Sequence, residues 1–335
     1  MKKQRRSAPS QGFPDIGDSA AIVVRVNNLF FSYSDRPALK DFTLEARVGE
    51  VLGILGPNGS GKSTLFGILS TLMVPARGTV EIAGIDVIAR PHDARRQIGV
   101  VFQSAGLDGK LSIVENLRYQ GYFYGMKGGF LESRIEDLLK TFALWERRED
   151  RVEVLSGGLQ RRAELAKGLL HQPRVLLLDE PSTGLDPAAR RDFWRYLREA
   201  QKNAPMTVLL TTHLLDEADG CDRVAIVDQG RLVASGKPGE LRNNIGGDVL
   251  IVRSSDVVRL QRHLRRKFGI QAVMVNSELH METHESARMI PRIAQAYPSL
   301  IEEITMRKPT LEDVFLHETG HRLEPNQPMD GRKEG

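Results

Sequence analysis

Residues 56–64 read GPNGSGKST, a glycine-rich stretch whose residue types and spacing suit the binding of a nucleoside triphosphate. The stretch satisfies the pattern G-x-x-x-x-G-K-[ST], in which glycines let backbone N–H groups wrap around phosphates. Lys62 is predicted to reach the β- and γ-phosphates, and the Ser63 hydroxyl is predicted to ligate Mg²⁺. The predicted nucleotide contacts of this loop are Gly56, Pro57, Asn58, Gly59, Ser60, Gly61, Lys62, Ser63 and Thr64.

A second stretch suited to chemistry is RVLLLDEPSTGLDP at residues 174–187, where an apolar strand ends in two adjacent carboxylates. Asp179, at the end of the strand, is predicted to hold Mg²⁺ through water. The side chain of Glu180, one residue later, is predicted to point in a different direction from that of Asp179. It is predicted to activate the water that attacks the terminal phosphate. The alternative, a solvated turn after a strand, is disfavoured because a phosphate-binding loop follows a neighbouring strand.

A third stretch, LSGGLQRR at residues 155–162, opens a predicted helix with a serine and two glycines. The Ser156 hydroxyl and the amides of Gly157 and Gly158 would form a second anion site at the helix start. One nucleotide cannot readily use two such loops of one chain if they lie on different faces. Two copies arranged head to tail can use them, so the sequence predicts a homodimer that closes over nucleotide and opens on hydrolysis.

The elements that position these residues alternate between strands and helices over residues 21–240, which predicts an α/β domain with a parallel core. VLGIL at 51–55 is typical of a buried strand, and a helix is predicted from about Lys62 to Met73. Strands at 22–33 and 39–48 are separated by a predicted turn around Asp35–Pro37. Further strands are expected at 78–84, 98–103, 174–179, 206–212 and, as a hairpin, within 222–236; helices are expected over 112–144, from about 156 and over 187–202.

The C-terminal part has a different order of elements. Residues 245–320 are predicted to alternate as β-α-β-β-α-β before a last helix, the order of a small ferredoxin-like domain. Residues 1–20 and 321–335 are polar, and we expect a disordered arm and a disordered tail there.

Composition limits the class of protein. The chain has 335 residues and a net charge of +4, which gives weak support to a nucleic-acid partner, and none is expected. Cys221 is the only cysteine, as expected in a reducing compartment. No apolar run approaches the roughly 18–20 residues that span a bilayer, and no secretory signal is evident. We therefore expect a cytoplasmic protein whose membrane role depends on a partner.

Residues 21–240 resemble the ATP-binding subunits of ABC transporters. The resemblance rests on these motifs, which occur in the order that this family has. GPNGSGKST resembles the Walker A loop, VLLLDE the Walker B strand and LSGGLQRR the signature loop. The resemblance implies a P-loop NTPase fold with a RecA-like parallel core, an antiparallel β subdomain and a helical subdomain at about 104–160. The small α+β domain would follow them. It also implies ATP and Mg²⁺ as cofactors, and a separate permease that holds the protein at the inner face of the membrane.

The same resemblance implies roles for four residues outside these loops. Gln103 looks like the Q-loop glutamine, which senses Mg²⁺ and water, and His213 looks like the switch histidine that contacts the γ-phosphate. Asp186 stands at the D-loop position, implied to cross the dimer interface, and Tyr33 stands where an aromatic ring stacks on adenine. Taken singly, each has another interpretation: Gln103 as a surface residue, His213 as structural, Tyr33 as core or hairpin packing.

Two features narrow the resemblance to the ABC-2-type exporters, a branch that includes drug-resistance ATPases: Glu164, and the segment MRKPTLEDVFLHETG at 306–320. Leu159 departs from the Gln or Met usual in the signature loop, although the Ser156–Gly158 donors are intact. The predicted function is an ATPase that powers a separately encoded export permease. The alternatives are a soluble ABC ATPase of translation or repair, or a non-hydrolysing nucleotide-binding regulator.

Three other segments allow competing interpretations. YQGYFYGM at 119–126 carries aromatic side chains that suit a permease-docking groove, with core packing as the favoured alternative. His280 and His284 have a spacing that suits a metal, but no third ligand is evident and a structural role is preferred. Basic residues at 259–267 alternate with Val258, Leu260, Leu264 and Phe268, which predicts the solvated face of an amphipathic helix.

Overall fold

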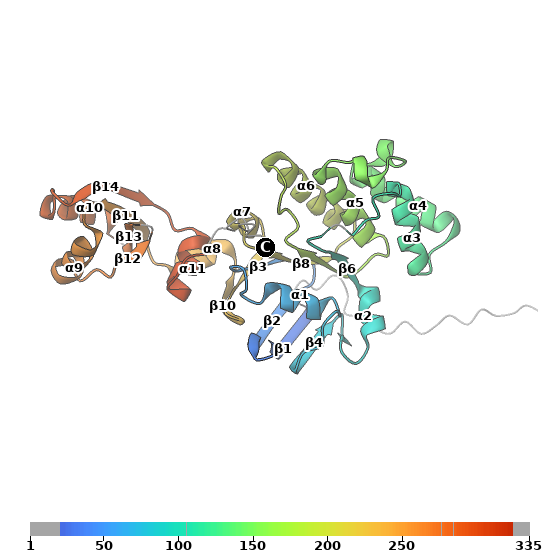
Figure 1. The fold of residues 1–335 in the computed structure, drawn as a ribbon, viewed down its shortest axis with the longest axis horizontal. Helices are drawn as coiled ribbons and strands as arrows, with labels where there is room; N and C mark the ends of the chain where they lie inside the picture. Colours follow the sequence, from blue (N-terminus) through green and yellow to red (C-terminus); the bar gives the residue numbers. More distant parts are fainter. Residues whose placement is uncertain (1–20, 105, 276, 284, 324–335) are drawn as a thin grey trace, which may run out of the picture. The chain divides into compact units, whose positions relative to one another are not determined.

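The computed structural model describes residues 21–104, 106–275, 277–283 and 285–323. The predicted arm at 1–20 and residues 324–335 of the predicted tail lie outside the described residues. The chain divides into two compact units (Figure 1). Among the described residues, the first contains residues 21–52, Gly61–Thr211 and Gln229–Arg231; the second contains Gly53–Ser60, Thr212–Asp228 and residues 232–323.

The first unit contains an antiparallel sheet of four strands in the order β2-β1-β4-β5 (Figure 1). The turn between its first two strands is at Ser34–Asp35, slightly earlier than the turn expected around Asp35–Pro37. Ser34 adopts a positive φ of 49°, which closes the hairpin tightly. The strands are β1 (Ile22–Tyr33), β2 (Arg36–Arg47), β4 (Arg77–Ile82) and β5 (Ile85–Asp86).

Parallel strands form the core of the same unit. In β6 (Ile98–Val101), β7 (Val175–Asp179) and β8 (Thr207–Thr212), Ile98 pairs with Val175 and Val175 pairs with Thr207. Most of their residues are buried, as expected for parallel strands covered on both faces. The Val208 N–H donates to the Glu50 carbonyl and so places β8 beside the start of β3 (Val51–Leu55).

Two helices of the first unit begin within predicted motifs: α1 at the end of the phosphate loop, and α5 in the stretch LSGGLQRR. The helix α1 (Lys62–Leu69) follows the phosphate loop and ends earlier than the predicted Met73, because Thr71 takes a φ of 64° that no helix allows. The helix α5 begins beyond Ser156, as predicted. The helices that follow α1 are α2 (Pro91–Gln97), α3 (Ile113–Phe123), α4 (Gly128–Thr141), α5 (Gly157–Leu169) and α6 (Pro187–Asn203), with short 3₁₀ turns at η1 (Trp145–Arg147) and η2 (Val152–Val154).

Aromatic side chains at the end of α3 are mostly exposed. Tyr119 and Tyr122 are 53% and 55% exposed, and Phe123 is 86% exposed. Core packing, the favoured interpretation of this segment, is therefore wrong for these three. It holds only for Tyr124, whose ring stacks on His171 at a centroid distance of 3.8 Å.

The second unit contains two strands and two short helices that follow β8 in the chain. The residues Gln229 and Gly230, which are assigned to the first unit, both have positive φ and form the predicted turn between β9 and β10. The elements are α7 (Leu215–Asp219), β9 (Arg223–Asp228), β10 (Arg231–Gly236) and α8 (Pro238–Asn244).

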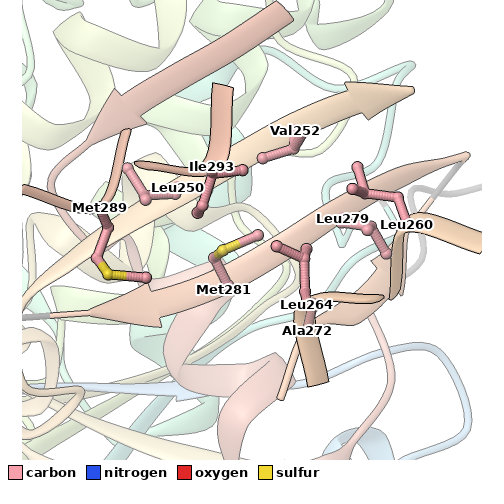
Figure 2. Close-up of a cluster of buried hydrophobic side chains, with 9 residues drawn as sticks. All are labelled: Leu250, Val252, Leu260, Leu264, Ala272, Leu279, Met281, Met289 and Ile293. Carbon is pink, nitrogen blue, oxygen red and sulfur yellow. The ribbon is translucent and has the colours of Figure 1, made fainter. Parts of the chain in front are cut away.

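A second antiparallel sheet, in the order β12-β13-β11-β14, completes this unit. Its elements are β11 (Asp248–Ser254), α9 (Val257–Phe268), β12 (Val273–Val275), β13 (Glu278–Thr283), α10 (Ser286–Ala296), β14 (Ile301–Arg307) and α11 (Leu311–Thr319). Figure 2 shows a cluster of buried side chains from α9, α10, the sheet and the residue just before β12: Leu250, Val252, Leu260, Leu264, Ala272, Leu279, Met281, Met289 and Ile293. This cluster is the hydrophobic core beneath the two helices.

The helix α9 has the solvated basic face that its sequence predicts. Leu260 and Leu264 are fully buried, whereas Arg259, Arg262 and the 265–267 run are exposed. Val258 is 51% exposed, so it lies outside the packed face of the helix, where its apolar side chain was expected. None of the helices in the described part of the chain has both the length and the apolar composition that a bilayer crossing requires.

Candidate nucleotide-binding site

The first part of the phosphate loop, residues 56–60, belongs to the second unit. Gly56 admits no side chain, because a Cβ atom there would lie 2.3 Å from the Val227 carbonyl oxygen. Gly59 has a φ of 79°, which favours glycine. Ser60 is 3% exposed, and its hydroxyl finds no hydrogen-bond partner within the described ranges. A buried hydroxyl of this kind fits a loop that binds the oxygen atoms of a phosphate.

The remainder of the loop, residues 61–64, belongs to the first unit and starts α1. Gly61 has a φ of 108°, and a Cβ there would lie 2.6 Å from the Ala38 carbonyl oxygen. Lys62 is buried in the first turn of α1, and Ser63 is exposed. The helix dipole favours the binding of an anion at this end of the helix. Burial lowers the pKa of Lys62, while Glu180 and Asp179 raise it in opposition. The ammonium group therefore lies in the field of both carboxylates.

Asp179 ends β7 and is fixed by a neighbouring strand. Its Oδ1 atom accepts a hydrogen bond of 2.6 Å from the Thr211 hydroxyl, because Asp179 and Thr211 are partners in the parallel ladder. Burial raises the pKa of Asp179, Glu180 raises it further, and the Thr211 bond and Lys62 lower it. A carboxylate that is costly to ionise gains from a cation, so Asp179 and the hydroxyl of Ser63 fit the oxygen ligands that Mg²⁺ prefers.

Glu180 is held in a strained and buried position. Its φ of 43° lies in the left-handed region, which costs a residue with a long side chain about 1 kcal/mol or more. Its N–H donates to the Thr211 hydroxyl at 3.0 Å. Its Oε2 atom accepts hydrogen bonds of 3.2 Å from Gln103 Nε2 and from the Thr183 hydroxyl. The left-handed φ turns the backbone at Glu180, and Gln103 and Thr183 hold its carboxylate.

The raised pKa of Asp179 predicts a gain of stability when the charge is removed. Above the raised pKa the ionised carboxylate destabilises the fold, whereas below its ordinary value of 3.8 this cost is absent. We therefore expect Asp179→Asn to raise the unfolding temperature of the nucleotide-free protein by a few degrees at pH 8, and by less at pH 4. Differential scanning calorimetry at both pH values measures the difference.

The matched control for this substitution is Asp137→Asn, which changes an exposed carboxylate on α4 of the same unit. It should leave the unfolding temperature unchanged at both pH values. An Asp179→Asn protein that unfolds at a lower temperature than the wild type at pH 8 contradicts the prediction.

The serine-glycine turn lies at the start of α5 and is open to solvent. Ser156 is the N-cap residue, and it is exposed together with Gly157. A Cβ atom at Gly157 would have only Leu185 Cδ2 within 4 Å, at 3.9 Å. The start of this thirteen-residue helix is therefore open at Ser156 and Gly157, where another molecule can bring an anion to the first N–H groups.

Asp186 has a local partner in the structure. Its Oδ1 atom accepts hydrogen bonds from the N–H groups of Ala188 and Ala189, at 2.9 and 3.0 Å, and so caps α6. These two bonds lower the pKa of Asp186. The expected role of this residue at a dimer interface must therefore coexist with its role as a helix cap.

The aromatic residue Tyr33 lies beside the phosphate loop's helix. It is 50% exposed, and its hydroxyl oxygen accepts a hydrogen bond of 3.4 Å from the Thr64 hydroxyl. Its ring meets Phe31 edge-on at 5.0 Å, which leaves part of the ring surface open for stacking. His213 follows β8 directly and is half-buried in the second unit.

Two site residues were missed from the sequence. Thr211 holds both Asp179 and the backbone of Glu180, and the register of β7 and β8 was the signal that could have found it. Arg161 is a buried cation on α5 that forms an ion pair with Glu164. The i, i+3 spacing of these two residues was the one sequence signal that could have indicated this pair. Among the described residues no three His, Cys, Asp or Glu side chains gather as a metal site, and His284 lies outside them.

Comparisons with family models and with known proteins found relatives of this chain. Residues 39–183 match a family model described as "ABC transporter". The chain is 36% identical over 310 residues to the daunorubicin resistance ATP-binding protein DrrA2 of Streptomyces coeruleorubidus, covering 90% of this chain and 96% of the relative. It is 35% identical over 303 residues to Nod factor export ATP-binding protein I of Cupriavidus metallidurans, covering 90% and 98%.

A solved ATP-binding subunit of an ABC transporter matches with 31% identity and a TM-score of 0.60, covering 67% of this chain and 93% of that one. This likeness confirms the predicted P-loop α/β fold. The match to the ABC transporter family and to ATP-binding relatives over nearly the whole chain supports the binding and hydrolysis of ATP. The chain belongs to the ATP-binding subunits of ABC transporters.

Proposed function

We propose that this chain energises a separately encoded membrane permease, and that the cargo moves outward. The relatives that cover nearly the whole chain are named for daunorubicin resistance and for Nod factor export. In this proposal the protein lies at the inner face of the membrane through its contact with the permease. The permease would make the contacts with cargo, so the direction of transport is inferred from these relatives.

The observation that carries the ATPase mechanism is the position of Glu180. Its buried carboxylate lies in the field of Lys62 and is hydrogen-bonded to Gln103 and Thr183. In the proposed reaction Glu180 accepts a proton from the attacking water, and Gln103 orients that water. Mg²⁺, held by Ser63, Gln103 and Asp179, would supply neutralisation of phosphate charge. His213 would contact the γ-phosphate, and Tyr33 would stack on adenine.

The open start of α5 supports a homodimer as the active form. Ser156–Gly158 of one copy would bind the γ-phosphate of a nucleotide held by residues 56–64 of the other copy. Asp186 would lie at the interface between the two copies. ATP would therefore join the two subunits, and hydrolysis would release them.

Reconstitution with the partner tests this function. The tagged chain is purified from membranes in mild detergent, and the membrane protein that copurifies is identified and placed with it in liposomes. We expect phosphate release that the partner stimulates severalfold, together with ATP-dependent movement of cargo. Absence of phosphate release would favour a nucleotide-binding regulator, and retention of no membrane protein would favour a soluble ABC ATPase.

A further inference from the structure

Arg161 joins three parts of the first unit from a buried position on α5. The residue is 7% exposed, and its guanidinium donates at 2.6 Å to the carbonyl oxygen of Phe102, the residue before Gln103. It also donates at 2.6 Å to the carbonyl oxygen of Pro181. Longer bonds of 3.3 and 3.4 Å reach the carbonyl oxygens of Asp179 and Glu180. One side chain thus contacts the backbone on both sides of Glu180 and beside Gln103.

Glu164 and Lys167 extend this connection along one face of α5. Glu164 accepts a bond of 2.5 Å from Arg161 Nη1 and a bond of 2.7 Å from the N–H of Gly106. Lys167 donates to the carbonyl oxygen of the same glycine. These three side chains recur at the i, i+3 spacing of one helix face. Phe102 and Gly106 are therefore both fastened to α5.

The chemistry of these contacts requires an arginine. A guanidinium has five N–H donors in a planar fork, whereas a lysine ammonium is a compact charge that cannot reach several separated carbonyl oxygens at once. Removing a guanidinium and a carboxylate from water is costly, and the ion pair with Glu164 recovers only part of that cost. The arrangement is thus suited to fixing geometry, and the strained φ of 43° at Glu180 needs such fixing.

We propose that Arg161 is a positioning residue for ATP hydrolysis, which keeps Gln103 within hydrogen-bond distance of Glu180 and couples both to α5. This inference rests on the proposed role of Glu180 as the base. The same helix begins at the Ser156–Gly158 turn. On this proposal, a movement of Phe102 and Gly106 moves the anion-binding turn that α5 offers to the second copy, because Arg161 and Glu164 connect them to this helix.

The test is Arg161→Lys, compared with Arg162→Lys in the full-length protein. Arg162 is the adjacent arginine of the same helix, and it contacts the Phe142 carbonyl oxygen and the Tyr196 hydroxyl, away from Gln103 and Glu180. We expect Arg161→Lys to lower kcat about 10- to 100-fold and to change the Kd for ATP less than about threefold. Arg162→Lys should leave kcat within about threefold of the wild type.

A readout that does not depend on activity is hydrogen exchange in the peptide that covers residues 102–106. Arg161→Lys should speed exchange there, and Arg162→Lys should not. If Arg161→Lys proves unstable, Glu164→Gln serves as the second variant, since it weakens the ion pair and retains an acceptor for the Gly106 N–H. Unchanged kcat and unchanged exchange in both variants would overturn the proposal.

A double-mutant cycle separates this inference from the proposed function. If Arg161 acts through Gln103, the loss of kcat on Arg161→Lys is smaller in a Gln103→Ala background than in the wild type. Equal losses in the two backgrounds would show independent roles and contradict the positioning proposal alone. Normal turnover by Glu180→Gln would instead contradict the role of Glu180 as the base. The hydrogen exchange of Arg161→Lys would still test whether Arg161 holds residues 102–106.

Discussion

Glu180→Gln is expected to lower the rate of ATP hydrolysis at least about 100-fold while leaving the Kd for ATP within about threefold of the wild type. The amide keeps the size of the side chain and its oxygen can still accept the bonds from Gln103 and Thr183, which are both 3.2 Å in the wild type. What the substitution removes is the ability to accept a proton from water. Phosphate release and isothermal titration with ATP measure the two quantities separately.

The matched control is Glu199→Gln, which makes the same chemical change on an exposed position of α6. It should hydrolyse ATP at the rate of the wild type. Because ATP persists in the Glu180→Gln protein, this variant should also accumulate as the ATP-bound dimer, which light scattering detects. If Glu180→Gln hydrolyses ATP at a rate within about threefold of the wild type, Glu180 is not the base.

The parallel core was readable from the sequence because strong local signals agreed there. The apolar run at 51–55 is β3 as predicted, and β7 begins one residue after the predicted start of its strand. The structure confirms helix α6 to within a residue, since Pro187 begins it and Asp186 caps it. Each of these segments combines a buried apolar pattern with a definite start signal, so local preference and tertiary packing point the same way.

Features that depend on tertiary contacts were not readable. The partnership of Thr211 with Asp179 follows from the register of two strands that are distant in the chain. Arg161 carried no signal of burial, since arginine is mostly exposed in proteins. The exposure of Phe123 could not be inferred from an aromatic composition that suits a core equally well. Short elements such as α2 and α8 lacked the length over which a periodic pattern can be recognised.

Gly157→Asp is expected to abolish the ATP-dependent dimer, because it places a carboxylate where the γ-phosphate of the second copy's nucleotide would bind. A like charge at about 4 Å costs several kcal/mol near a protein surface, so the dimer should weaken about 100-fold or more. Steric strain does not explain such a loss, since only Leu185 Cδ2 would lie within 4 Å of a Cβ atom there. The measurement is light scattering with ATP in the Glu180→Gln background.

Two controls separate charge at this turn from other effects of the substitution. Gly157→Asn adds the same volume without charge and should weaken the dimer much less than Gly157→Asp. Gly129→Asp adds the same charge near the start of α4, where a Cβ atom would meet nothing within 4 Å, and should dimerise normally. A Gly157→Asp protein that dimerises like the Gly129→Asp control would mean that this turn binds no phosphate in the dimer. The composite site would then have to be abandoned, even if Glu180 remained the base within each subunit.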